Sequence, residues 1–208
     1  MIKLKIIFIH GLGQNKSTWN KIVNEFDGQD DIICLDLYTH FKEKFSNYND
    51  LYNEFKKYLS KYDEVILIGI SLGGILITDY LIENPKNVKK AVIIGSVYKI
   101  PKLLFKMQNI IFKLLPNRTF NSMGISKNEV ISLTESMTKI NFTNKLDKIK
   151  TPVLIVCGDK DNVNKKSAKL LNKNFMNSKL IFIKNSKHEV NIEKPVELGN
   201  KIKTFLRD

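Results

Sequence analysis

The chain has 208 residues, of which 43% are hydrophobic, and these values are typical of one globular domain that covers residues 1–208. No apolar run approaches the roughly 18 residues of a membrane-spanning helix, so no such helix is expected. The net charge is +13, but the lysines are scattered through every segment without a dense basic run. Because a phosphate-binding face needs clustered basic residues, no nucleic-acid partner is expected.

The first nine residues, Met1 to Ile9, have an apolar core that is too brief for a signal sequence. No small-residue cleavage site follows this core, so a cytoplasmic location is expected. The cysteines, Cys34 and Cys157, lie in apolar strand-like runs, and there is no CxxC motif or Cys/His cluster. These features predict buried free thiols in a reducing compartment.

Short apolar runs alternate with amphipathic segments along the chain. The runs predict strands at residues 5–9, 32–35, 65–70, 91–94, 153–156 and 180–183. Three-four spacing of apolar residues predicts helices at residues 19–26, 51–59, 75–82, 168–175 and 198–206. The strand segments are almost continuously apolar, as is typical of parallel strands covered on both faces. The fold class is therefore predicted to be α/β, with a doubly wound, mostly parallel sheet of about six strands.

Residues 97–148 interrupt this alternation, because they contain no strand signal. Apolar residues at three-four spacing predict a helix from residue 100 to Pro116. Ser126 and Glu129 form the pattern of a capping box, which predicts the start of a second helix. A segment of this length is too long for a simple connection, so a helical cap insertion is expected here.

Three predicted strands end in loops that carry chemically active side chains. Ser71 lies in Gly-Ile-Ser-Leu-Gly-Gly at a strand-to-helix turn, which pushes its hydroxyl into the open. A later loop contains Asp159 and Asp161, and the last contains His188. Since the carboxyl ends of parallel strands meet at one edge of the sheet, these loops supply a serine, a carboxylate and a base to the same region.

The order of these motifs resembles that of the α/β-hydrolase family over essentially the whole chain. The matching segments are residues 10–13 with Trp19, the strand ending in Asp36, the turn at 69–74, the run 152–161, and His188 with residues 193–195. The resemblance implies a Ser71–His188–Asp161 catalytic triad. It also implies an oxyanion hole formed by the backbone N–H groups of Leu12 and Leu72.

The chain departs from the family pattern in two places. It begins at what corresponds to the third strand of the family, so we expect the α/β-hydrolase fold without its first two strands and with the remaining order unchanged. At residues 36–40 the sequence is Asp-Leu-Tyr-Thr-His, where many relatives carry glycines. The usual conformation of that loop is therefore open to question, but the triad is not affected.

Asp159 is the alternative to Asp161 as the acid, because a small shift of the loop could exchange the two carboxylates. Asp36 and Asp147 are more distant alternatives, and Glu193 has the position of a helix-start residue. His188 is the expected base.

The two remaining histidines receive other interpretations. His10 is expected to support the oxyanion loop through hydrogen bonds, and His40 is expected to lie in a solvated loop.

Leu12 and Leu72 flank the carbon under attack, so they are also predicted to line the acyl pocket. Trp19 and Val190 are predicted substrate neighbours, as is Gln14, with packing in the core as the alternative for each. The lysine-rich cap is expected to cover the site; the alternative is a lid that loosens on an anionic membrane surface.

The predicted function is hydrolysis of carboxylic esters with small or medium acyl groups, through an acyl-enzyme on Ser71. This chemistry needs no cofactor and no metal. Thioesterase, monoacylglycerol lipase and carbon–carbon bond hydrolase activities remain alternatives that use the same triad. A ligand-binding module with little turnover is an alternative of another class. The expected partner is a small-molecule ester, and a monomer is expected.

Overall fold

The computed structural model describes residues 4–26, 31–42, 45–121 and 124–208. Six parallel strands form one sheet in the order β2-β1-β3-β4-β5-β6. The strands are β1 (Lys5–Ile9), β2 (Asp31–Leu35), β3 (Val65–Ile70), β4 (Val88–Ile94), β5 (Val153–Gly158) and β6 (Ser178–Ile183). All six predicted strands are confirmed, and so is the α/β class with a parallel sheet.

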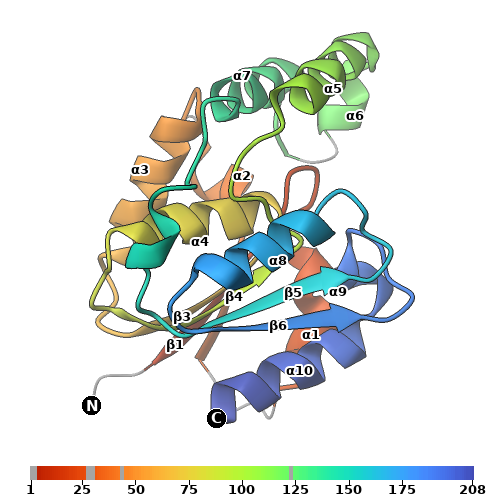
Figure 1. The fold of residues 1–208 in the computed structure, drawn as a ribbon. Helices are drawn as coiled ribbons and strands as arrows, with labels where there is room; N and C mark the ends of the chain where they lie inside the picture. Colours follow the sequence, from red (N-terminus) through yellow and green to blue (C-terminus); the bar gives the residue numbers. More distant parts are fainter. Residues whose placement is uncertain (1–3, 27–30, 43–44, 122–123) are drawn as a thin grey trace.

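Helices cover both faces of the sheet (Figure 1). One face is covered by α3 (Tyr48–Leu59), α4 (Leu72–Ile82) and α8 (Lys165–Asn174). The other is covered by the 3₁₀ turn η1 (Lys16–Trp19), α1 (Asn20–Val23) and α10 (Pro195–Arg207). Successive side chains of a strand point to opposite faces, so Ile7 and Ile9 join one core while Ile6 and Phe8 join the other. This burial on both faces explains why the strands are almost entirely apolar.

Three helices lie between β4 and β5: α5 (Lys102–Leu114), α6 (Asn117–Asn121) and α7 (Lys127–Met137). We call them the α5–α7 layer. They lie beyond α3 and α4, on the same side of the sheet (Figure 1). The predicted capping box is present, because Ser126 Oγ accepts from the Glu129 N–H and the Glu129 carboxylate accepts from the Ser126 N–H. As expected, α5 ends before Pro116.

The base of the α5–α7 layer is closed by a short antiparallel pairing. The Phe142 N–H donates to Tyr98 O at 2.8 Å, and the Ile100 N–H donates to Ile140 O at 3.2 Å. The turn η2 (Leu146–Lys148) then leads into β5. Apolar side chains of α7, including Leu133, belong to the same core as α4, so this helix is anchored to the body of the fold.

Three one-turn helices were not predicted: α2 (Leu37–His40), α6 and α9 (Val190–Glu193). In α2 the Asp36 carboxylate accepts from the Thr39 N–H at 3.1 Å and caps the helix. This cap answers the question about residues 36–40, because a capped helical turn needs no glycine. His40 ends this turn with an exposed side chain, so it lies in a helix and not in a loop.

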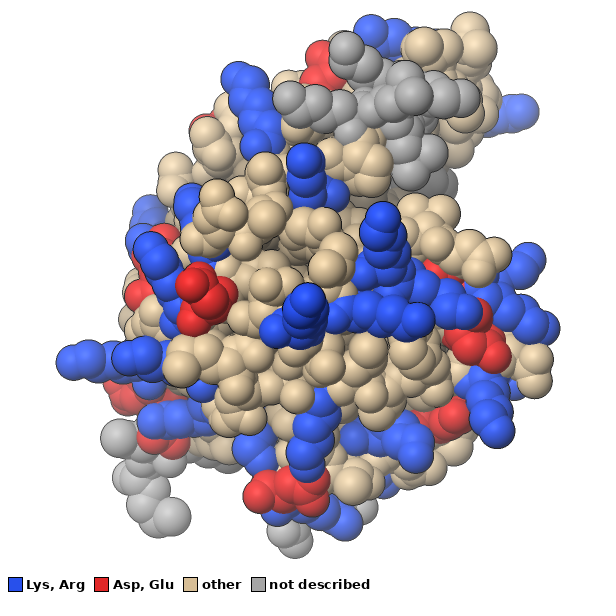
Figure 2. Space-filling model, in the orientation of Figure 1, with Lys and Arg blue, Asp and Glu red and all other residues tan. Residues whose placement is uncertain are grey.

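The face of the molecule shown in Figure 2 is rich in basic side chains. Figure 2 shows lysine and arginine side chains across the face in view, interspersed with acidic and uncharged ones. On α5, the large side chains Ile110, Ile111 and Leu114 are exposed. No helix in the described ranges is long and apolar enough to cross a membrane. Cys157 is buried as expected, whereas Cys34 is only half-buried on the edge strand β2.

Candidate active site

The turn between β3 and α4 places Ser71 in a backbone conformation that L-residues rarely adopt, with φ 52° and ψ −111°. Glycines allow the turn to be this tight. A Cβ on Gly69 would lie 2.6 Å from the carbonyl carbon of Gly73, and a Cβ on Gly73 would overlap the backbone of Ile9. The Ser71 N–H donates to Ile94 O at 2.9 Å, which ties the turn to β4. The strained conformation is therefore imposed by its surroundings.

His188 lies in the loop after β6, and Asp161 lies in the loop after β5. The Nδ1 atom of His188 is 3.0 Å from Asp161 Oδ2. The Asp161 side chain is only 4% exposed, whereas that of His188 is 42% exposed. An ionised carboxylate only accepts hydrogen bonds, so His188 Nδ1 is the donor and Nε2 is left free to accept a proton.

Asn164, at the N-terminus of α8, also binds the Asp161 carboxylate. Its Nδ2 atom donates to Oδ1 at 3.0 Å and to Oδ2 at 2.8 Å, and its backbone N–H donates to Oδ1 at 3.1 Å. Burial acts to raise the pKa of Asp161, but hydrogen bonds from His188 and Asn164 outweigh it and hold the pKa below 3.8. The sequence analysis did not identify Asn164. Its position three residues after Asp161 was the only local feature that could have indicated a contact between the two side chains.

The rival carboxylates have other contacts. Asp159 Oδ1 accepts from the Ser186 N–H at 3.3 Å, and within the described residues it makes no hydrogen bond to His188. Asp36 caps α2 and lies 3.9 Å from Nε2 of His10. Asp147 lies in η2, before β5 begins. The geometry favours Asp161 as the partner of His188.

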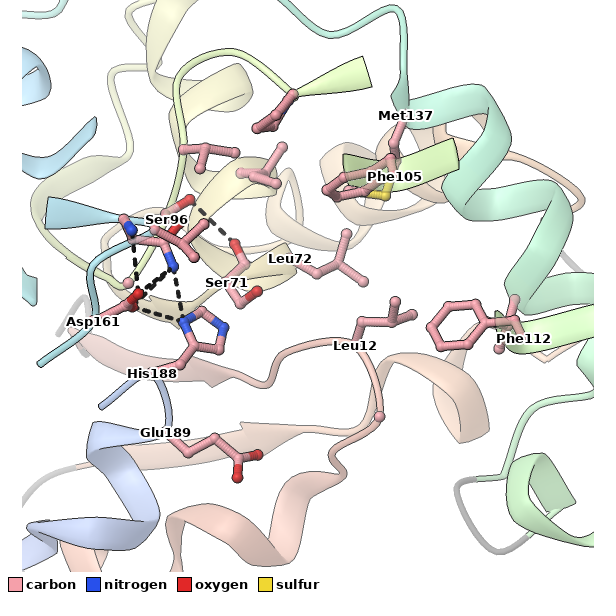
Figure 3. A pocket seen from close by; sticks show the side chains of 18 of the residues that line it. Leu12, Ser71, Leu72, Ser96, Phe105, Phe112, Met137, Asp161, His188 and Glu189 are labelled. Atoms are coloured by element: carbon pink, nitrogen blue, oxygen red, sulfur yellow. Dashed lines mark hydrogen bonds and ion pairs between the residues drawn. The ribbon is translucent and has the colours of Figure 1, made fainter. Parts of the chain in front are cut away.

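Ser71, Asp161 and His188 line one cavity of about 550 Å³ together with Leu12 and Leu72. In Figure 3 the Ser71 hydroxyl and the ring edge of His188 that is remote from Asp161 both face this cavity. No hydrogen bond joins Ser71 Oγ to His188 within the part of the chain that the structure describes. Catalytic hydrogen bonds are often long or poorly aligned before substrate binds, so the lack of this bond does not argue against proton transfer from Ser71 to His188.

The backbone N–H groups of Leu12 and Leu72 make no hydrogen bond to any described residue. Leu72 is the first residue of α4, where N–H groups have no partner inside the helix. Leu12 follows β1 and lines the same cavity. Neither N–H group is therefore committed to a partner among the described residues, as an oxyanion donor requires.

His10 is buried beneath the loop that carries Leu12. Its Nδ1 atom donates to Gly11 O at 2.8 Å, and its Nε2 atom accepts from the Leu37 N–H at 3.0 Å. The ring must be neutral to make both bonds. Burial lowers the pKa of His10 below 6.5 more strongly than the Gly11 carbonyl and the Asp36 charge raise it. The predicted supporting role of His10 agrees with this geometry.

This burial predicts a pH dependence of stability. In the unfolded chain His10 binds a proton as the pH falls through about 6.5, whereas in the folded chain its lower pKa keeps it neutral. The free energy of unfolding should therefore fall below pH 6.5 until the folded pKa is reached, by at most about 1.4 kcal/mol per pH unit. Urea unfolding at several pH values measures the slope. We expect His10→Gln to flatten it, and an unchanged slope in that variant would contradict the assignment.

For three predicted substrate neighbours the structure favours the alternative, packing in the core. Trp19 and Val190 are fully buried in the core between the sheet and α10, and they are absent from the described lining of the cavity. Their side chains pack on the face of the sheet opposite α4, which is why they do not reach the substrate side. Gln14 is also buried, and it binds Glu189 and Asn191.

Glu193 differs from its predicted role at a helix start. It ends α9, and its carboxylate accepts from the Lys187 N–H at 2.8 Å and from Ser186 Oγ at 3.3 Å. These bonds hold the turn that precedes His188. No group of three or more His, Cys, Asp or Glu side chains in the described ranges is arranged to hold a metal ion.

Comparison with known proteins places this architecture in a family. Residues 5–121, more than half of the chain, match the family described as alpha/beta hydrolase fold. The chain therefore belongs to the alpha/beta hydrolase fold family.

Individual relatives are more distant. A pimeloyl-[acyl-carrier protein] methyl ester esterase from Wigglesworthia glossinidia brevipalpis is 29% identical over 94 residues, which are 45% of this chain. The match spans only about a third, 36%, of that relative's length.

Among solved structures, an esterase from Exiguobacterium antarcticum superposes with a TM-score of 0.86 at 16% identity, over 99% of this chain and 92% of that one. MenH from S. aureus gives a TM-score of 0.82 at 19% identity, over 98% and 93%. Identities this low establish the fold alone.

Proposed function

We propose that the protein is a serine hydrolase that cleaves uncharged carboxylic esters through an acyl-enzyme on Ser71. His188 Nε2 takes the proton of Ser71 as its oxygen attacks the ester carbonyl, and Asp161 stabilises the imidazolium that forms. The N–H groups of Leu12 and Leu72 bind the oxyanion. His188 then protonates the leaving alcohol, and water repeats the sequence on the acyl-enzyme, which releases the acid and restores Ser71.

The observation that carries this proposal is the pairing of His188 with Asp161 at the wall of the cavity that Ser71 also lines. A serine on a strained turn beside a carboxylate-bound imidazole has little structural use, because the strain costs stability. The unpaired N–H groups of Leu12 and Leu72 add donors for developing negative charge. One such donor contributes about 3 kcal/mol to lowering the barrier in comparable enzymes.

The rest of the cavity supports an apolar acyl group. Away from Ser71 its walls are apolar side chains of α4, such as Ile75, and of the α5–α7 layer. Phe105, Phe112 and Met137 of this layer are seen in Figure 3. The volume of about 550 Å³ lies within the range of small-molecule sites. An acyl chain of medium length fits this description, with its carbonyl at Ser71 and its tail beneath α5.

Purified protein and a series of p-nitrophenyl esters, from acetate to dodecanoate, test the proposal. We expect kcat/KM to rise with chain length up to a medium-chain ester and then to fall, because each buried methylene contributes about 0.8 kcal/mol until the cavity is full. Absence of turnover throughout the series, with no covalent labelling of the folded protein by a fluorophosphonate, would favour a binding module instead.

The charges that line the cavity predict selectivity against anionic esters. Asp161 and Glu189 are the charged side chains among the described lining residues, although the whole protein is strongly basic. An ester whose acyl tail ends in a carboxylate should therefore react more slowly than its neutral counterpart. Hexanoate and monoadipate p-nitrophenyl esters make a matched pair of substrates.

Glu189→Gln should raise kcat/KM for the adipate ester by about three- to tenfold and leave the hexanoate ester within about twofold. The glutamine keeps an oxygen that can accept from Gln14, so the loop is preserved. Because Glu189 is exposed, added salt should shrink the difference. Equal changes for both esters would contradict an electrostatic effect.

A narrower substrate class is suggested by the relative from W. glossinidia, whose name specifies a methyl ester of an acyl chain on acyl-carrier protein. We propose methyl esters of carrier-bound acyl chains as a second set of test substrates. In that case the apolar cavity would hold part of the chain while the carrier stays outside.

A further inference from the structure

A pair of side-chain amides joins the loop after β1 to the loop that carries His188. Gln14 Nε2 donates to Glu189 Oε1 at 3.0 Å and to Asn191 Oδ1 at 3.4 Å, and Asn191 Nδ2 donates back to Gln14 Oε1 at 3.1 Å. Gln14 is 7% exposed and Asn191 is 1% exposed. The two amides thus form a buried, reciprocal contact between segments 177 residues apart.

On the side of β1, the Gln14 side chain contacts the peptide between His10 and Gly11, and the Gln14 backbone N–H contacts the next peptide, between Gly11 and Leu12. The Gly11 N–H donates to Gln14 Oε1 at 3.4 Å, and Gly11 O accepts from the Gln14 N–H at 3.2 Å and from His10 Nδ1 at 2.8 Å. Because the peptide group is planar, fixing the Gly11 carbonyl also fixes the direction of the Leu12 N–H. The Gln14 backbone N–H therefore holds the peptide that carries the candidate oxyanion donor, and the Gln14 side chain holds the peptide one residue before it.

On the other side, Asn191 lies in the first turn of α9, and Glu189 immediately follows His188. The sheet does not connect this loop to the Leu12 loop, because β3, β4 and β5 separate β1 from β6. A direct link between the two loops is therefore supplied by the amide pair and not by strand pairing. Acyl transfer requires a fixed position of the base relative to the oxyanion donors. A misplacement of about 1 Å lowers the rate roughly a hundredfold.

We propose that the Gln14–Asn191 pair has a positioning role: it fixes the position of the Leu12 N–H relative to the His188 ring. Neither side chain touches the substrate in this proposal, so both act through the loops they connect. The proposal rests on the hydrolase function proposed above, but it also makes a claim about the folded protein that does not need turnover.

The kinetic test uses Gln14→Leu, Asn191→Leu, the double variant, and the exchange variant Gln14→Asn with Asn191→Gln. We expect kcat for a p-nitrophenyl ester to fall by about 10- to 100-fold in each single variant, with KM within about threefold. The double variant should be no slower than the singles, because all three lose the same contact. The exchange variant keeps the summed length of the two amides and should recover most of kcat.

Asn87→Leu is the matched control for loss of stability. The Asn87 amide donates to Leu59 O at 3.0 Å and to Tyr62 O at 3.2 Å, at the end of the sheet opposite Ser71. It should lower Tm as the site variants do and leave kcat unchanged. If Gln14→Leu and Asn191→Leu also lower Tm without lowering kcat, the positioning role is wrong.

The structural test follows the Leu12 amide by nuclear magnetic resonance in ¹⁵N-labelled protein. Asn191→Leu should shift the Leu12 amide signal or speed its hydrogen exchange, although Asn191 lies on the other loop, whereas Asn87→Leu should do neither. An unmoved Leu12 signal would overturn the proposal. If the wild-type protein has no esterase activity but Asn191→Leu still shifts the Leu12 signal, the proposed hydrolase function is wrong. The structural link between the two loops is then still supported.

Discussion

Replacing Ser71 by alanine is expected to lower ester turnover by about a thousandfold or more. The variant also removes the oxygen that forms the acyl-enzyme, so a fluorophosphonate should no longer label the protein. Because alanine has the same backbone preferences as serine at φ 52°, the free energy of unfolding should change little. Steady-state kinetics, intact-protein mass spectrometry after labelling, and a urea titration measure these three effects.

Ser96 is the control for the identity of the nucleophile. It is the other serine among the described residues that line the cavity, and its Oγ donates to Ser71 O at 3.2 Å. Labelled wild-type protein should carry the phosphonate on the peptide that contains Ser71. A label on the Ser96 peptide, or full turnover in Ser71→Ala, would show that the assignment of the nucleophile is wrong.

The second large effect is expected for Asp161→Asn, which should also reduce kcat by about a thousandfold or more. The amide would no longer stabilise the imidazolium of His188, and it could hold the ring in the tautomer that lacks a free Nε2 acceptor. Asp159→Asn is the matched control, since it changes a neighbouring carboxylate that binds Ser186. It should stay within about threefold of wild type. The reverse pattern would identify Asp159 as the acid.

The pH dependence gives an independent check on Asp161. Its pKa is held below 3.8, so this carboxyl group should remain ionised in the folded protein across the usual assay range. The stability that its ionised form contributes should be present above the unfolded pKa of about 3.9 and be lost as the pH falls through the folded value. Asn164→Leu removes two of the stabilising contacts and should move this loss to higher pH, as measured by Tm between pH 3 and about 6.

Much of the fold could be predicted because it leaves a repeated signal. Parallel strands covered on both faces must be apolar throughout, so each strand appeared as a run of Ile, Val and Leu. Strand ends in such a sheet gather at one edge, which allowed Ser71, Asp161 and His188 to be grouped before any contact was known. The capping box at Ser126 and Glu129 was also readable, because its partners lie three residues apart.

Contacts between distant segments left no such signal. Nothing in the spacing of Gln14 and Asn191 indicates that they meet, and the same is true of Glu193 and the turn before His188. Trp19 is a residue for which the sequence left two interpretations open. An aromatic residue after the first loop suits a pocket wall as well as a core, and its direction depends on how η1 and α1 pack on β1.

The residue types and their order along the chain were sufficient to predict the class of fold, the tight turn at Ser71 and the position of His188 in the loop after the last strand, since these depend on local geometry and on burial. The choice of Asp161 over Asp159 depends on which carboxylate reaches His188, and the two side chains differ in that respect only after β5 and β6 are packed. The cavity likewise forms only where the α5–α7 layer covers α4, and its walls come from segments distant in sequence. Ser71 is recognisable from its neighbours in the chain, but its surroundings are made by the packing of the whole fold.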